Sequence, residues 1–223
     1  TEADLASHHV IVNGLQSLTP DIPVLSEEST DIPYSTRAQW HTYWLIDPLD
    51  GTKEFIKRNG EFTVNIALVH EGKAILGVVY VPVSQLTYYG DSEKGAFKMV
   101  ADGSSSAIRV TSEHQTPMRV AGSRSHAGDS LRQFLDRLGE HEIISMGSSL
   151  KLCLVAEGKA DIYPRLGPTS EWDTAAAQAV VEAAGGKVTD TQMNPLIYNA
   201  KESFLNPYFF VFGDASIDWS AYL

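Results

Sequence analysis

The segment WLIDPLDGT, residues 44–52, constrains the fold of this chain more than any other part of the sequence. An apolar run predicts a buried strand over residues 43–46, and the Asp-Pro pair that begins at Asp47 is expected to stop it, because proline cannot donate to a sheet ladder. Asp50 and the glycine after it predict a tight turn. Two carboxylates, three residues apart, therefore lie on bent backbone where a strand ends.

Such a bend can aim both carboxylates, and the carbonyl of Leu49 between them, at one point. Hard cations such as Mg²⁺ bind convergent oxygen ligands of this kind. A short helix is expected from about Thr52 to Lys57, and the free N–H groups at its start suit a phosphate. Aspartate, proline and glycine are also ordinary turn residues, so this segment alone leaves a plain turn open.

Further acidic residues lie at the ends of other predicted elements. Glu27 and Glu28 follow a short apolar run, and Asp173 opens a helix predicted over residues 172–184. Taken singly, the glutamates are typical of a solvated loop and Asp173 is typical of a helix cap. Three acidic groups at element ends, where side chains are exposed but rigidly held, together favour a cation site.

Strand patterns cluster in the first half of the chain and alternate with helix patterns in the second. Helices are expected over 1–18, 52–57, 129–138, 150–157 and 172–184, strands over 43–46, 62–69, 74–83, 86–90, 118–121, 161–163, 187–189 and 209–212, and a polar loop over 29–39. This order predicts an α/β sandwich that forms one catalytic unit, with subdomains of about 1–115 and 116–223. Because Thr1 lies within a helical pattern, we also expect a natural N-terminal segment ahead of it.

Composition narrows the class of protein. With 223 residues and a net charge of −11, the chain is expected to bind neither nucleic acid nor anionic lipid by bulk electrostatics. No run approaches ~18 consecutive apolar residues, so no transmembrane segment is expected. The single cysteine, Cys153, excludes an internal disulfide, fits a reducing compartment and is expected to be a buried packing residue.

The three acidic segments, in this order, resemble the inositol-monophosphatase superfamily. Its pattern is an acidic pair, then D-P-[IL]-D-G-T, then W-D-x-A-A ahead of A-G-G, and here these motifs stand at residues 26–28, 47–52, 172–176 and 183–186. The resemblance implies a layered α-β-α-β-α sandwich of the inositol-monophosphatase and fructose-1,6-bisphosphatase type.

Within this superfamily the sequence is most similar to bacterial 3′(2′),5′-bisphosphate nucleotidases of the CysQ type. The similarity is carried by residues 47–69, SRSH at 123–126, GSSLK at 147–151 and YPRLGPTSEWD at 163–173. It implies Mg²⁺-dependent hydrolysis of the 3′-phosphate of 3′-phosphoadenosine 5′-phosphate, a by-product of sulfate activation, to AMP and phosphate. It also implies inhibition by Li⁺ and a cytoplasmic location, with a peripheral position at the inner membrane as an alternative.

The resemblance assigns two or three Mg²⁺ ions to residues of the acidic motifs. Glu27, Asp47 and the Leu49 carbonyl would hold one ion, and Asp47, Asp50 and Asp173 would hold a second. These ligands would support direct attack by a metal-activated water, and no histidine or cysteine in the motifs indicates a covalent intermediate.

The resemblance also assigns residues that orient this water. Thr1 and Asp4 match a T-x-x-D element, whose aspartate would hydrogen-bond Thr52. With Glu27, this pair would orient the attacking water and help to deprotonate it.

Substrate contacts are expected from the same motifs and from basic residues near them. Arg165 stands where inositol monophosphatases carry a glutamate, and it would favour extra negative charge in the substrate. For the basic residues and for His126, a surface role is the alternative. The full expected set is Asp50, Gly51, Thr52, Lys53, Arg124, His126, Gly147, Ser148, Lys151, Arg165 and Asp173.

Two other functions remain open at this point. One is an inositol or sugar monophosphatase of the same superfamily, and the other is an inactive homologue that only binds a nucleotide or a metal ion. An apolar wall for an adenine base cannot be named from the sequence.

Overall fold

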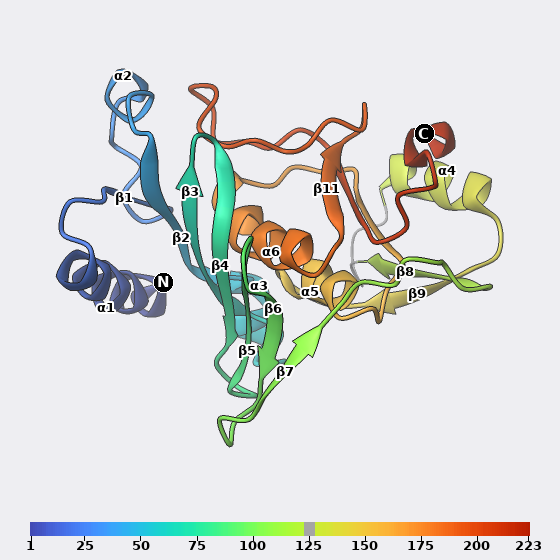
Figure 1. Cartoon of the computed structure of the whole chain (residues 1–223), viewed down its shortest axis with the longest axis horizontal. Coiled ribbons are helices and arrows are strands. Elements are labelled where there is room, and N and C mark those ends of the chain that lie inside the picture. Colours follow the sequence, from blue (N-terminus) through green and yellow to red (C-terminus); the bar gives the residue numbers. More distant parts are fainter. Residues whose placement is uncertain (123–127) are drawn as a thin grey trace.

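The computed structural model, which describes residues 1–122 and 128–223, contains two β-sheets with helices between and outside them (Figure 1). The first sheet has the order β1-β2-β3-β4-β5-β6-β7 and the second has the order β11-β12-β10-β8-β9. The strands of the first sheet are β1 (Val24–Ser26), β2 (Thr42–Asp50), β3 (Thr63–His70), β4 (Lys73–Val81), β5 (Leu86–Asp91), β6 (Gly95–Met99) and β7 (Ser105–Ile108). Those of the second are β8 (Met118–Gly122), β9 (His141–Ser145), β10 (Ile162–Arg165), β11 (Lys187–Asp190) and β12 (Phe209–Phe212).

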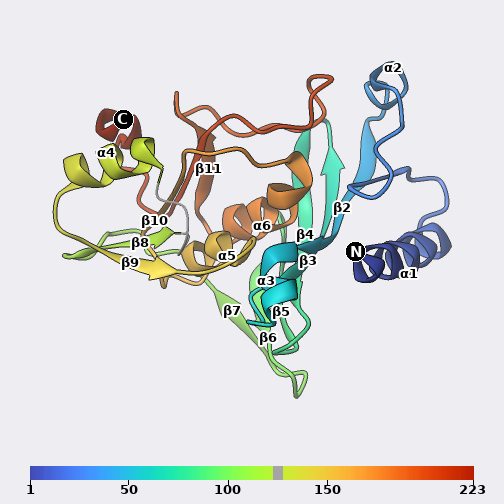
Figure 2. The same ribbon diagram turned by 180° about the vertical axis from the view of Figure 1, so that it is seen from behind.

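The helices complete five layers. Helix α1 (Glu2–Leu18) lies on the outer side of the first sheet, and α5 (Leu150–Ala156) and α6 (Glu171–Ala183) lie between the sheets (Figures 1 and 2). Helix α4 (Asp129–Leu138) and the 3₁₀ turn η1 (Trp219–Tyr222) cover the outer face of the second sheet, where a second apolar cluster forms. This arrangement confirms the predicted α-β-α-β-α sandwich.

Helix α6 packs between the sheets because its sequence is rich in alanine. Ala175, Ala176, Ala177 and Ala179 are all buried, and small side chains let the helix backbone approach the strands closely. At the closest point, a Cβ added to Gly77 of β4 would lie 1.9 Å from the carbonyl oxygen of Ala176. This close packing fixes where the first turn of α6 lies relative to the first sheet.

One apolar core joins the two sheets. It includes residues of the first sheet, of α5 and α6, and of the second sheet, and Cys153 is buried within it as a free thiol, as predicted. The two sheets are built from residues 24–108 and 118–212. A subdomain boundary near residue 115 stays a prediction, since the core is continuous across it.

Most expected elements form, and the exceptions have physical causes. The prediction that the first strand stops at Asp47 is wrong, because β2 continues to Asp50. The register shifts between Asp47 and Asp50, so Pro48 falls in a bulge that needs no ladder donor. The polar stretch 29–39 contains a short helix, α2 (Tyr34–Arg37), rather than only a loop. Strands β6, β7 and β9 were not expected.

Two helix boundaries complete the comparison. Helix α3 (Thr52–Lys57) forms as expected. Helix α4 begins at Asp129 as expected, and Gly128 occupies its N-cap without a side-chain hydrogen bond. In the described part of the chain, no helix combines the length and apolar character that crossing a membrane requires.

Candidate metal and phosphate site

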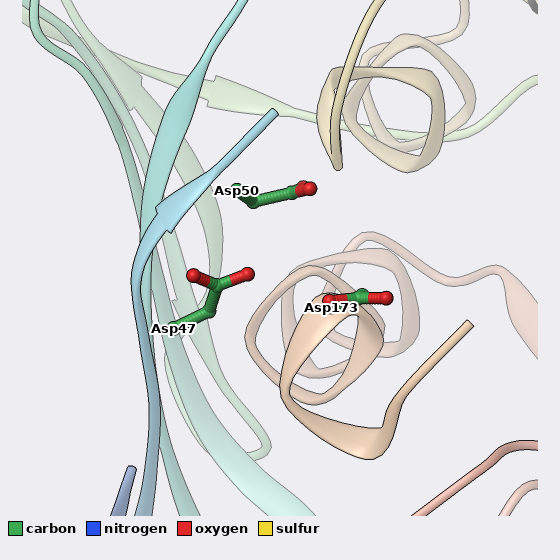
Figure 3. Close-up of side chains that lie close together, drawn as sticks. All are labelled: Asp47, Asp50 and Asp173. Atoms are coloured by element: carbon green, nitrogen blue, oxygen red, sulfur yellow. The ribbon is translucent and has the colours of Figure 1, made fainter. Parts of the chain in front are cut away.

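Three carboxylates meet between the end of β2 and the start of α6. Asp47, Asp50 and Asp173 each offer an oxygen atom, and these atoms all lie within 4.8 Å of one another. Figure 3 shows Asp47 and Asp50 projecting from the end of the strand into the space beside the first turn of α6, where Asp173 lies. The clustering of these three predicted ligands is therefore seen in the folded chain.

The bulge in β2 puts two of these carboxylates on one face of the sheet. Side chains three apart in a regular strand point to opposite faces. Here Asp47 pairs with Asn65 and Asp50 pairs with Thr63, two positions that share a face of β3. Since cross-strand partners lie on the same face, the extra residue turns Asp50 to the side of Asp47.

Asp173 is brought to the cluster by the cap of α6. Ser170 is the N-cap in a capping box, and its N–H donates to Asp173 Oδ2 at 2.8 Å. Asp173 therefore takes part in the cap of α6 and also offers an oxygen atom to the cluster. The partial positive charge of the helix N-terminus also favours a carboxylate here.

The pKa values of the clustered carboxylates are governed by burial and mutual repulsion, which the charges of Lys151 and Arg165 offset only in part. Burial raises the pKa of Asp47 well above its usual value, and the charges of Asp50, Glu27 and Asp173 raise it further. Burial and the neighbouring carboxylates also raise the pKa of Asp50 to about 7 and that of Asp173 to about 6. A divalent cation would offset this repulsion, so a convergent set of oxygen donors fits a metal ion.

Glu27 lies in the turn after β1, and its carboxylate is not one of the three whose oxygen atoms lie within 4.8 Å of one another. Its backbone N–H donates to the Ile46 carbonyl at 3.2 Å, which holds the turn beside β2. The charge of Glu27 is among the causes that raise the pKa of Asp47, so the two carboxyl groups lie near each other. Partial burial of its carboxyl group raises the pKa of Glu27, and nearby acidic groups raise it further.

The Leu49 carbonyl and the Asp4–Thr52 pair stay predictions. Leu49 is buried in the bulge, and its N–H donates to Asp47 Oδ1 at 2.9 Å. Asp4 is buried and its carboxylate accepts a hydrogen bond from the Thr1 hydroxyl, whereas Thr52 lies exposed at the start of α3.

Helix α1 is tied to both acidic segments by residues that the motifs did not include. The Ser7 hydroxyl donates to the Pro48 carbonyl at 2.8 Å. His8 Nδ1 lies 2.8 Å from Ser26 Oγ, directly before Glu27. The contact of His8 with buried Ser26 is structural.

A cavity of about 490 Å³ opens beside Asp50 and Asp173. Thr52 is not among its lining residues, and Arg124 and His126 lie outside the described residues. The expected substrate contacts that line the cavity are Asp50, Gly51, Lys53, Gly147, Ser148, Lys151, Arg165 and Asp173. Its volume lies within the range of small-molecule sites.

Lys151 and Arg165, two of the basic residues that line the cavity, differ in how many of their donors are already hydrogen-bonded. Lys151 is buried, donates to the carbonyls of Met146 and Ser148 at 3.2 and 2.8 Å, and lies 5.5 Å from the Tyr163 ring centroid. Burial lowers its pKa. Arg165 donates through Nη2 to the Pro168 carbonyl at 2.9 Å, whereas its Nε has no hydrogen-bond partner. Lys151 thus braces a loop, and Arg165 keeps donor capacity.

The cavity also has an apolar part that sequence reasoning missed. Its members come from α4, α5, β10, the loop after β10, and β12, so no single sequence pattern unites them. They are Leu131, Leu152, Tyr163, Leu166 and Phe209.

Comparisons with known proteins agree with this geometry. A sequence model described as the inositol monophosphatase family matches residues 1–208. The chain is 56% identical to a 3′(2′),5′-bisphosphate nucleotidase, CysQ, of Salmonella typhimurium, and 57% identical to the protein of that name from Escherichia coli K12. Each match covers 94% of this chain and 83% of the relative.

A solved structure gives the same result for the fold. CysQ from Bacteroides thetaiotaomicron, described as a bacterial member of the inositol monophosphatase family, superimposes with a TM-score of 0.86 at 43% identity, over 94% of this chain and 83% of that one. The match to the family sequence model extends over most of the chain and includes all three clustered carboxylates. The chain belongs to the inositol monophosphatase family.

Proposed function

We propose that this protein is a Mg²⁺-dependent 3′(2′),5′-bisphosphate nucleotidase that removes the 3′-phosphate of 3′-phosphoadenosine 5′-phosphate. The observation that carries the proposal is the meeting of Asp47, Asp50 and Asp173 beside a cavity, in a chain 56% identical to a CysQ nucleotidase. Such a carboxylate cluster suits a phosphate monoester as substrate. The phosphate group is negatively charged, so acidic residues can bind it only through a cation.

The carboxylates would hold the cations and fix the phosphoryl group relative to them. Asp47, Asp50 and Asp173 would hold one cation, and Asp47 would also hold a second together with Glu27 and the Leu49 carbonyl. Bound Mg²⁺ would supply charge neutralisation of the phosphoryl group and a lowered pKa for the attacking water.

Proton transfer and orientation would fall to residues at the edge of the cluster. Glu27 lies partly exposed next to Asp47, where it can accept a proton from water. Asp4 and Thr52 would orient that water, as the family resemblance implies.

The second phosphate would bind on the basic side of the cavity. Arg165 keeps an unpaired donor there, and Lys53 and Lys151 also line the cavity. The chain as a whole has a net charge of −11, so this local positive charge favours binding of an anionic group in the cavity rather than elsewhere on the surface. The apolar side chains of the cavity would pack against the base.

A substrate panel tests the proposal. Phosphate release is measured with Mg²⁺ from 3′-phosphoadenosine 5′-phosphate, from AMP and from inositol 1-phosphate, with an EDTA control. We expect rapid release from the bisphosphate and little from the other two. Efficient turnover of inositol 1-phosphate without turnover of the bisphosphate would instead establish the alternative phosphatase, and no metal-dependent release from any of them would indicate an inactive homologue.

The Arg165→Gln variant tests the assignment of the second phosphate. We expect KM for the bisphosphate to rise about tenfold or more, because a charge-assisted hydrogen bond is lost. A KM equal to that of the unaltered protein would remove Arg165 from the substrate site. The cytoplasmic location and the peripheral alternative stay predictions.

A further inference from the structure

Three buried polar side chains lie directly behind Asp50. Thr63 and Asn65 are 0% and 1% exposed on β3, and Ser149 is 2% exposed in the turn before α5. None of them belongs to an acidic motif. Because burying a polar group is unfavourable unless it is hydrogen-bonded, their arrangement needs a physical account.

The three side chains form one connected network that ends at Asp50. The Ser149 N–H donates to Asp50 Oδ2 at 2.6 Å, and Thr63 Oγ1 lies 3.5 Å from the same oxygen. Thr63 Oγ1 and Ser149 Oγ are 2.9 Å apart, and Ser149 Oγ donates to Asn65 Oδ1 at 2.8 Å.

Hydrogen counting fixes the direction of these bonds. A hydroxyl has one hydrogen, so a Ser149 hydroxyl that donates to Asn65 must accept from Thr63. The Thr63 hydrogen is then used over the shorter distance, to Ser149. Asn65 Oδ1 is held as an acceptor, and its Nδ2 group must point away from Ser149.

With the bonds in these directions, the Asn65 Nδ2 group is the donor that remains unused. It is buried and has no hydrogen-bond partner in the structure. Asn65 pairs with Asp47 across the strands, and its side chain lies on the face of the first sheet that carries Asp47 and Asp50. The unpaired donor therefore lies on the side of the clustered carboxylates.

We propose that Thr63, Ser149 and Asn65 are positioning residues that hold the Asp50 carboxylate in the orientation that binds a divalent cation, with the Asn65 Nδ2 group kept as a donor on the side of the carboxylates. The inference rests on the metal site of the proposed function. The relay from Thr63 through Ser149 to Asn65 limits the rotation of each side chain, so less ordering is left for the moment of binding.

Identical substitutions at two buried threonines test the relay. Thr63→Val removes the first hydroxyl while keeping the side-chain shape. Thr189→Val is the matched control, because Thr189 is 3% exposed on β11 and does not line the cavity. Mg²⁺ binding is measured by calorimetry on the full chain without substrate, and the unfolding midpoint is measured in EDTA.

We expect Thr63→Val to raise the Kd for Mg²⁺ about tenfold or more, the usual cost of losing a residue that orients a metal ligand. Thr189→Val should leave this Kd unchanged while lowering the unfolding midpoint about as much as Thr63→Val does. Thr63→Ser, which keeps the hydroxyl, should restore binding. Ser149→Ala, which keeps the N–H bond to Asp50, should weaken binding as Thr63→Val does.

An unchanged Kd in both Thr63→Val and Ser149→Ala would overturn the relay while leaving the nucleotidase proposal standing. Should the unaltered protein bind Mg²⁺ but not hydrolyse the bisphosphate, the nucleotidase proposal fails and the relay is still judged by the same titrations. Absence of Mg²⁺ binding by the unaltered protein would overturn both.

Discussion

Each of the three clustered carboxylates is held through one oxygen by a backbone N–H group. Leu49, Ser149 and Ser170 are the donors, at 2.9, 2.6 and 2.8 Å from Asp47, Asp50 and Asp173 respectively. Backbone donors do not have to be ordered by side-chain packing, so the carboxylates are oriented as soon as the chain folds. The opposing effect is mutual repulsion, which raises their pKa values until a cation or a proton is bound.

The Asp47→Asn substitution separates these two effects. We expect Mg²⁺-dependent phosphate release to fall by orders of magnitude, because an amide cannot replace a shared anionic ligand. In EDTA the unfolding midpoint should stay the same or rise, because the substitution removes one of several buried carboxylates that repel one another. Asp102→Asn, at an exposed turn, is the control for both measurements. Retained turnover in Asp47→Asn would contradict the site.

The sequence predicts the acidic members of the site but not the residues that support them. Asp47, Asp50 and Asp173 could be found because aspartates at element ends form recognisable motifs. Asn65 and Ser149 resemble ordinary polar residues of a strand and a turn. Their burial depends on the turn before α5 lying against β3, a tertiary contact that carries no local pattern.

Among the secondary-structure elements, the strands that were expected have a local apolar pattern, and those that were not expected lack one. The strands β3 and β4 alternate buried and more exposed side chains along most of their length, which is the pattern that sequence analysis uses. The edge strand β7 has three exposed residues in four, so no apolar period indicates it. The course of β2 past Pro48 likewise depends on a bulge that only pairing with β3 defines.

Close packing of α6 on β4 predicts a large cost for a single methyl group. Gly77→Ala would place a Cβ 1.9 Å from the Ala176 carbonyl oxygen, so the helix or the strand must shift. We expect the free energy of unfolding to fall by about 1–3 kcal/mol, the usual cost of overpacking. Denaturant unfolding measures it.

Gly14→Ala is the matched control for this substitution. Gly14 lies within α1 with no atom within 4 Å of an added Cβ. Alanine there should stabilise the protein by up to about 1 kcal/mol, since glycine is unfavourable inside a helix. If both variants changed stability equally, the close contact between α6 and β4 would be wrong.

A contact between the loop before β8 and the C-terminal segment predicts a dependence on acid. Asp214 accepts hydrogen bonds from Ser216 and lies 3.1 Å from His114 Nδ1, and these contacts lower its pKa to about 2. The ordinary value is 3.8, so the unfolded chain binds the proton more tightly. The contribution to stability is therefore present above pH 4 and is lost as the pH falls toward 2.

Asp214→Asn should accordingly be less stable at neutral pH and lose less stability between pH 4 and 2 than the unaltered protein. The control is Asp218→Asn, because exposed Asp218 makes the same pair of hydrogen bonds, to Ser220. Urea unfolding at each pH gives both slopes. Parallel pH profiles for the unaltered and Asp214→Asn proteins would show that this contact does not contribute.

For the whole molecule, the position of the acidic cluster links metal binding to the stability of the fold. Asp47 and Asp50 belong to the first sheet, and Asp173 belongs to the helix that packs between the sheets. The ligands are far apart in the unfolded chain and meet only when α6 packs on β2. A cation that needs all three therefore binds the folded state in preference to the unfolded state.

Mg²⁺ should consequently raise the unfolding midpoint in proportion to its saturation of the site. At a free concentration of 100 times Kd, the expected gain in unfolding free energy is about 2.7 kcal/mol, and EDTA should abolish it. NaCl at equal ionic strength controls for screening of the net charge of −11, and Asp173→Asn controls for binding elsewhere on the acidic surface. If NaCl stabilised the protein as much as Mg²⁺ does, or Asp173→Asn kept the full gain, the cation would be acting on surface charge. A gain that needs Mg²⁺ and Asp173 together can arise only where the sheet and the helix meet.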